Sequence, residues 1–165
     1  MVTFSDRFAC TPAQYWEMWL SAEYQSGLHL QGMGFPQYRV LERAPESWKV
    51  HVVPTALPGA VRKVLGDGGY IEEAHRDGNV WRFDIIPDTL GDRIHTAGVI
   101  RIEGDGTDGP QTLRSVEIEV TVKLMGIGRA VKKAMEAMMS KHQDAATAYT
   151  HAAIAGGMLT NEENG

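Results

Sequence analysis

The 165-residue sequence predicts a single α+β domain, in which an antiparallel sheet packs against one long helix. Residues 126–155 repeat apolar side chains three and four positions apart, as one face of a helix does. Residues 35–124 change to a period of two, which is typical of strands. No internal repeat or second linker indicates another domain, so we expect one domain over residues 1–159 and a polar tail over 160–165.

The first 34 residues predict a strand followed by short helices. Polar and apolar residues alternate from Val2 to Cys10, as in a half-buried strand. Thr11 then suits a helix N-cap and Pro12 the first helical position. Aromatic residues in 13–25 are spaced for one or two short helices, whereas residues 27–34 hold too many glycines to continue a helix. We expect those last residues to form a mobile connection.

The middle of the chain predicts six strands in three hairpins. The predicted pairs are residues 38–43 with 47–53, 70–76 with 80–86, and 93–103 with 111–124. The second hairpin turns at Asp77-Gly78, which is a strong turn signal. A short helix over 60–65 separates the first two pairs. In the last strand, valine and isoleucine alternate with charged residues, so one face should be buried and the other wet.

The long helix presents a continuous apolar stripe that needs a sheet to cover it. The stripe consists of Ile127, Val131, Ala134, Met138, His142, Ala145, Tyr149 and Ala152, and it is widened by Met135, Met139, Ala146 and Ala153. Lysines and acidic residues lie off the stripe, and the pair Gly156-Gly157 ends the helix.

Composition restricts the classes of partner. The chain is 43% hydrophobic, carries a net charge of −5 and has no run of Lys or Arg, which argues against nucleic acid. Its apolar runs are too short to cross a bilayer, and its start lacks the pattern of a secretory signal. The one cysteine, Cys10, cannot form an internal disulfide. We therefore expect a cytoplasmic monomer or homodimer with no integral membrane segment.

The order strand, two helices, six strands and closing helix resembles the START-like superfamily. Four stretches are similar to an uncharacterised family within it: residues 8–25, 52–67, 94–106 and 116–139. The resemblance implies a helix-grip fold, in which a curved antiparallel sheet of about seven strands wraps around the closing helix. It also implies a cavity between sheet and helix, usually for a hydrophobic, lipid-like or polyketide-like small molecule. It implies no reaction, because members include lipid carriers, aromatic cyclases, chaperone regulators and simple binders.

The inward-facing residues are the candidates for binding such a ligand. Strand alternation places aromatic and aliphatic side chains on one sheet face, opposite the methionines of the long helix. A filled core would explain the same pattern, and it is the resemblance that favours a cavity. The predicted ligand-binding residues are Trp48, Val50, Val52, Trp81, Phe83, Ile85, Ile100, Met135, Met138 and His142.

His142 is the most informative polar residue, because it lies on the apolar stripe. It either packs with a hydrogen-bond partner or contacts a ligand in the cavity. A cyclase or dehydratase that uses His142 with Tyr149, seven residues further on, is the alternative function. The adjacent carboxylates Glu72 and Glu73 point to opposite faces and cannot act as a pair, so we predict no catalytic residue.

Other chemistries find little support in the sequence. The histidines have no metal-ligand spacing, and we expect neither a metal nor a cofactor. Residues 104–109 (GDGTDG) superficially resemble a calcium loop but are better explained as a hairpin turn. A second alternative is a protein-interaction module with a filled core, which would use the exposed sheet or the helix that carries Trp16 and Trp19.

Overall fold

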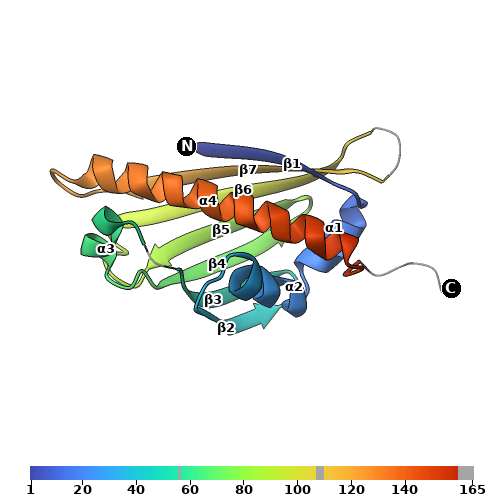
Figure 1. The fold of residues 1–165 in the computed structure, drawn as a ribbon, viewed down its shortest axis with the longest axis horizontal. Coiled ribbons are helices and arrows are strands. Elements are labelled where there is room, and N and C mark those ends of the chain that lie inside the picture. Colours follow the sequence, from blue (N-terminus) through green and yellow to red (C-terminus); the bar gives the residue numbers. More distant parts are fainter. Residues whose placement is uncertain (56, 107–109, 160–165) are drawn as a thin grey trace.

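The computed structural model describes residues 1–55, 57–106 and 110–159, and seven of its strands form one antiparallel sheet (Figure 1). The strands are β1 (Val2–Phe8), β2 (Gln37–Ala44), β3 (Ser47–Val53), β4 (Tyr70–Asp77), β5 (Val80–Pro87), β6 (Ile94–Gly104) and β7 (Thr112–Val122). Their order across the sheet is β1-β7-β6-β5-β4-β3-β2, so the pairing of β1 with β7 is the only one between described strands that are not consecutive in the chain. The predicted α+β helix-grip fold is confirmed.

The helices lie on one face and at the two ends of this curved sheet. They are α1 (Pro12–Trp19), α2 (Ala22–Gly27), the π-helix η1 (Leu28–Gly32), α3 (Gly59–Leu65) and α4 (Gly128–Ala155). Figure 1 shows α4 crossing the length of the sheet, with α1 and α2 near one end and α3 near the other. In the part of the chain that is described, no helix is long and apolar enough to cross a membrane.

The start of α1 follows the sequence prediction. The Thr11 hydroxyl accepts a hydrogen bond from the Gln14 backbone N–H at 3.2 Å, and the Gln14 side-chain oxygen accepts one from the Thr11 N–H at 2.9 Å. This reciprocal capping box satisfies two N–H groups that the helix itself leaves unbonded. Pro12 occupies the first helical position, where its missing N–H is not needed.

The expectation that the glycines of residues 27–34 prevent a helix is wrong. The chain continues directly from α2 into η1, and the Met33 N–H donates to the Leu28 carbonyl at 2.8 Å. The glycines make room for Tyr149 of α4: a Cβ on Gly27 would lie 2.0 Å from the Tyr149 hydroxyl oxygen, and one on Gly32 would lie 2.9 Å from the Tyr149 Cβ. Close packing against α4, rather than local propensity, therefore orders this segment.

The buried stripe of α4 is rotated from the predicted one. Its deepest apolar residues are Val131, Met135, Ala146 and Ala153, three of which belong to the predicted edge of the stripe rather than its centre. Ile127 precedes the helix and is 51% exposed. The periodicity established that one face is buried, but the position of the sheet beneath it decided which residues go deepest.

Gly78 and Asn79 form the turn of the second hairpin, one residue later than predicted. Gly78 has a φ of +63°, a left-handed backbone conformation that favours glycine. The proposed turn over 104–109 and the polar tail over 160–165 fall partly or wholly outside the described residues.

Candidate ligand-binding site

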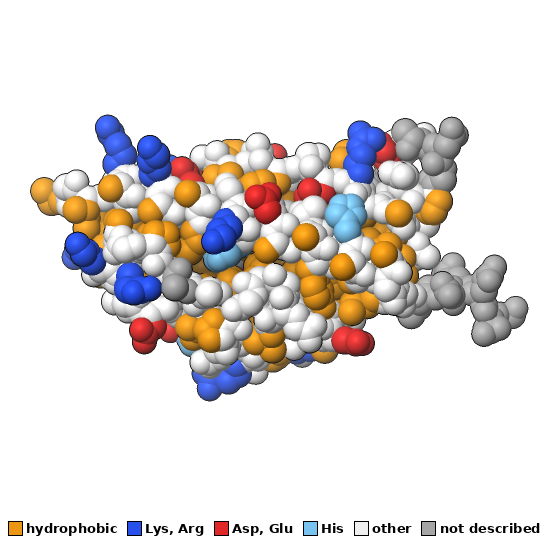
Figure 2. Space-filling view, viewed as in Figure 1, with side chains coloured by type: hydrophobic (Ala, Val, Ile, Leu, Met, Phe, Trp, Pro, Cys, Tyr) orange, Lys and Arg blue, Asp and Glu red, His pale blue; other side chains and the backbone are white. Residues whose placement is uncertain are grey.

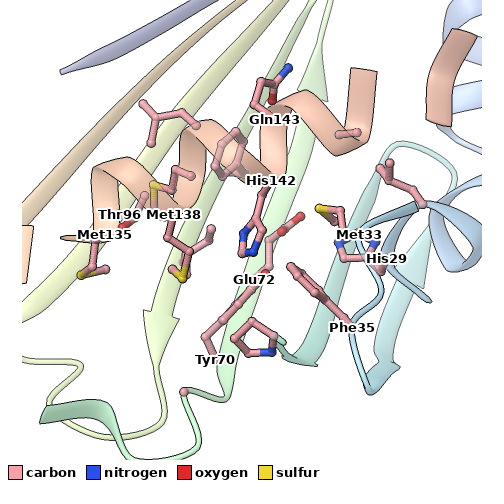
Figure 3. Close-up of a pocket in the computed structure, with 18 of the residues that line it drawn as sticks. His29, Met33, Phe35, Tyr70, Glu72, Thr96, Met135, Met138, His142 and Gln143 are labelled. Atoms are coloured by element: carbon pink, nitrogen blue, oxygen red, sulfur yellow. The ribbon is translucent and has the colours of Figure 1, made fainter. Parts of the chain in front are cut away.

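A cavity of about 170 Å³ lies between the inner face of the sheet and α4 (Figure 3). The strands β4, β5 and β6 form its floor, α4 forms its roof, and η1 with the residues that follow it forms one side. Most of the lining is apolar or aromatic. Seen from outside, hydrophobic side chains follow the seam between α4 and the α2–η1 segment (Figure 2).

The cavity brings together most of the predicted ligand-binding residues. Those that line it are Trp81, Phe83, Ile85, Ile100, Met135, Met138 and His142. Phe83 folds over Gly98 on the neighbouring strand, where a Cβ would lie 2.0 Å from the Phe83 ring. A side chain at position 98 would therefore displace Phe83 from the floor of the cavity.

Trp48, Val50 and Val52 lie on the same sheet face but do not line the cavity. All three are buried on β3, near the edge of the sheet that η1 and β2 cover. His29 of η1 stacks on Tyr38 of β2, with ring centroids 4.5 Å apart, and so closes this edge. Trp48 acts one layer behind the lining: its ring centroid lies 4.0 Å from that of Trp81. Strand alternation predicts the face of a side chain but not what covers it.

Glu72 is the site residue that the sequence analysis missed. It pairs with Ile85 across β4 and β5 and therefore points to the inner face, where it lines the cavity (Figure 3). The Trp48 indole N–H donates to its carboxyl oxygen at 3.3 Å. Burial raises the pKa of Glu72 to about 7, against the opposing effect of this hydrogen bond. A signal existed in the sequence: closing a two-residue hairpin turn puts Glu72 on the same face as Phe83 and Ile85.

Two neutral histidines also face the cavity. Burial lowers the pKa of both His29 and His142 to about 4, and Lys141 contributes to the lowered pKa of His142. His29 Nδ1 lies 2.8 Å from the Gln25 carbonyl, which only accepts, so the proton resides on Nδ1. His142 packs edge-on against Phe35, with ring centroids 4.8 Å apart. Both rings can therefore offer a neutral polar atom to a ligand near pH 7.

The proposed pairing of His142 with Tyr149 does not occur at this cavity. Tyr149 packs against Gly27, Gly32 and the Tyr24 ring and is not part of the lining. Seven residues bring two side chains to one helix face, but the contact with α2 and η1 draws Tyr149 away. The helix suggested for protein binding is also occupied, because Trp16 and Trp19 are both buried.

Three buried polar atoms of the lining have no hydrogen-bond partner among the described residues. They are Trp19 Nε1, Trp81 Nε1 and Thr96 Oγ1. Buried polar groups are nearly always bonded, and each unpaired one costs free energy. The walls are therefore apolar in bulk, with a few hydrogen-bonding atoms set among them.

A second buried charge lies outside the cavity, at the other edge of the sheet. The Arg114 guanidinium donates to Asp6 and to Thr147, each at 2.8 Å, and lies 4.8 Å above the Phe8 ring. Tyr15 accepts a longer hydrogen bond of 3.4 Å. These contacts join β1, β7, α1 and α4, and they give Arg114 a structural role.

Glu72→Gln is expected to change how the stability of the protein depends on pH. The pKa of Glu72 is about 7 in the folded protein against an ordinary 4.5, so the folded state holds this proton more tightly. The free energy of unfolding should therefore fall as pH rises from 4.5 to 7, by up to about 3 kcal/mol through Glu72. Urea unfolding of both proteins at pH 4 and pH 8 checks this.

The difference between wild type and Glu72→Gln isolates this contribution. His29 and His142 titrate over an overlapping range with the opposite sign, because their lowered pKa values favour stability at high pH. Their contribution is common to both proteins and cancels. A difference that does not change with pH would show that Glu72 is not held in an apolar environment.

The curved sheet, the closing helix and the cavity between them define a START-like, helix-grip domain. Solved structures share the fold, although their sequences are distant. The Zhui aromatase/cyclase from Streptomyces sp. R1128 is 13% identical, with a TM-score of 0.67 over 92% of this chain and 90% of that one. Norcoclaurine synthase from Thalictrum flavum is 14% identical, with a TM-score of 0.66 over 97% and 88%. A START superfamily protein from Mycobacterium smegmatis is 17% identical, with a TM-score of 0.59 over 90% and 95%.

The chain itself belongs to the family described as a protein of unknown function, DUF2505, whose model matches residues 3–154. No curated protein matches its sequence significantly.

Proposed function

We propose that this protein binds a small hydrophobic molecule in the cavity between the sheet and α4. The observation that carries the proposal is the cavity itself: about 170 Å³ of space with largely apolar and aromatic walls and a few convergent polar groups. Binding sites for small molecules have this composition, whereas a packed core leaves few voids larger than a water molecule.

The size of the cavity favours a compact ligand. An engineered protein cavity of about 150 Å³ accepts benzene. A volume of about 170 Å³ therefore suits a molecule built on one ring better than a long-chain lipid. Phe35, Phe83 and Trp81 supply flat aromatic surfaces against which such a ring can pack. One of the solved neighbours, norcoclaurine synthase, is in complex with dopamine and hydroxybenzaldehyde, which are small aromatic molecules.

Cys10 supports a cytoplasmic location for this binding. It is buried and is the only cysteine of the chain, as is usual where thiols stay reduced. Burial also raises the pKa of its thiol, which makes the residue unreactive.

Ala146→Phe is expected to abolish binding of a one-ring probe such as 2-phenylethanol. Ala146 lines the cavity, so the larger side chain should occupy the space of the ligand. The matched control is Ala148→Phe, two residues along the same helix on its exposed side. Titration monitored by the methyl NMR signals of Met135, Met138 and Met139, which all line the cavity, measures the affinity.

Binding that survives in folded Ala146→Phe would place the probe elsewhere and contradict the proposal.

The same samples address the alternative function, a cyclase-type enzyme. Glu72, with a pKa of about 7 in the cavity, is the observation that favours it, because a general acid or base works best with a pKa near the operating pH. Mass spectrometry after incubation of these proteins with an aromatic polyketide-like substrate distinguishes the two: an unchanged substrate supports binding alone, and an altered one supports catalysis.

A further inference from the structure

Among the described residues, the lining of the cavity contains an acidic side chain and no basic Lys or Arg side chain. Glu72 is the only acidic residue of the described lining. The Glu72 carboxyl accepts one neutral hydrogen bond, of 3.3 Å from the Trp48 indole N–H, and forms no ion pair among the described residues. A carboxylate in an apolar site is stable only when it is paired or protonated.

We propose that the ligand is a small aromatic or alicyclic amine, bound as an ammonium ion that pairs with the Glu72 carboxylate. This inference rests on the proposed function and gives the chemical class of the ligand. The ammonium would supply the partner that the protein does not provide, and the ring would occupy the apolar part of the cavity.

Ligands of the other charge types fit the cavity less well. A fatty acid or a phosphorylated compound would place a second negative charge beside Glu72 with no cationic side chain of the lining to offset it. A neutral molecule would fill the space but leave the carboxylate without a counter-ion. An ammonium ion removes both costs at once, through a charge-assisted hydrogen bond.

The aromatic walls also suit a cation. Trp81 and Phe83 line the floor of the cavity. Phe35 and Tyr70 line it beside Glu72 (Figure 3). The face of an aromatic ring attracts a cation, most strongly where water is excluded. A carboxylate among aromatic rings is therefore complementary to an organic ammonium in both its charge and its apolar body.

The groups that surround Glu72 leave its charge uncompensated in the free protein. Tyr70 on β4 and Tyr38 on β2 are near enough to interact with it. Burial, and to a smaller extent the Glu72 charge, raises the pKa of Tyr38 to about 12. His29 and His142 face the cavity as neutral rings, since burial lowers the pKa of each to about 4. From β3, Trp48 offers only its neutral N–H.

Arg43 of β2 carries a guanidinium that contacts Trp48, the hydrogen-bond donor of Glu72. It lies over the Trp48 ring, 6.0 Å from the ring centroid, and donates to the Leu20 carbonyl. It forms no ion pair with Glu72 among the described contacts. An ammonium ligand would consequently be the main counter-charge and would lower the pKa of Glu72 when it binds.

Three probes test the inference: 2-phenylethylamine, 2-phenylethanol and 3-phenylpropanoate, which share a phenylethyl group and differ in charge. Calorimetric titration at pH 8 should show the amine binding about tenfold or more tightly than the alcohol, as a hydrogen bond between charged groups allows. The propanoate should bind most weakly. Glu72→Gln should remove the preference for the amine over the alcohol.

Glu73→Gln is the matched control. Glu73 is the next residue on the same strand, points to the opposite face and pairs with Lys49 at 2.8 Å. This variant should keep the preference for the amine. A wild-type measurement independent of any variant is the pH dependence: between pH 8 and pH 6 the amine should lose about tenfold in affinity, as Glu72 takes up its proton, while the alcohol should not.

The outcomes separate this inference from the proposed function. Equal affinity for amine and alcohol in the wild type overturns the amine assignment but leaves binding in the cavity intact. Tighter binding of the propanoate also overturns it. If none of the three probes binds, both the inference and the proposed function fail for ligands of this size.

Discussion

Met135→Asp is expected to unfold the protein or to reduce its free energy of unfolding by several kcal/mol. Met135 is 4% exposed on the face of α4 that packs against the sheet, and a lone carboxylate there would be buried without a partner. Typical domains have only about 5–15 kcal/mol of stability in total. Circular dichroism during thermal and urea unfolding measures the effect.

Lys133→Asp is the control on the same helix. Lys133 is exposed, so the same new side chain should change the free energy of unfolding by about 0.5 kcal/mol or less. Met138, at the centre of the stripe predicted from the sequence, is a weaker test because it is only half-buried. Similar melting of the Met135 and Lys133 variants would mean that α4 does not cover the sheet in the way described.

Asp6→Ala is the second substitution with a large expected effect, a loss of about 3–5 kcal/mol in the free energy of unfolding. Asp6 accepts from Arg114 at 2.8 Å, and Arg114 is 2% exposed. Removing the carboxylate leaves a buried guanidinium without its counter-charge, although Thr147 and Tyr15 still accept hydrogen bonds from it. Urea unfolding at pH 7 measures the loss.

Asp84→Ala provides the comparison for Asp6. Asp84 pairs with His95 at a similar distance, 2.8 Å, but both side chains are exposed on the outer face of the sheet. Exposed pairs contribute about 1 kcal/mol or less, so this variant should be nearly neutral. Replacing Asp6 and Arg114 together with apolar residues should cost less than Asp6→Ala alone, because no unpaired charge remains. Equal losses for Asp6→Ala and Asp84→Ala would contradict the structural role of the buried pair.

The cavity residues show what the alternation of residues along a strand can and cannot predict. Alternation placed Trp81, Phe83 and Ile85 on the inner face, and they line the cavity. The same rule put Trp48 on that face without revealing that β2 and η1 cover the edge where it lies. Glu72 was missed because it was considered only with its neighbour Glu73. Its hairpin partner Ile85 carries the information that its carboxyl points inward.

The sequence by itself determined the order of the elements, the existence of an apolar helix face and the capping of α1 at Thr11. These features depend on residues a few positions apart, whose spacing and hydrogen bonds are visible in one dimension. The resemblance to START-like proteins supplied the expectation that the space between sheet and helix is hollow, which a periodic pattern does not distinguish from a filled core.

Only the tertiary structure decided the contacts between distant segments. Asp6 and Arg114 are 108 residues apart in the sequence. Tyr149 packs against Gly27 and Gly32, which lie more than a hundred residues before it. The π-helix η1 forms because those glycines admit a tyrosine ring from α4, against the local preference of a glycine-rich stretch for a loop. The pKa of Glu72 likewise depends on what lies above β4, since burial is a property of the packed layers and not of the strand.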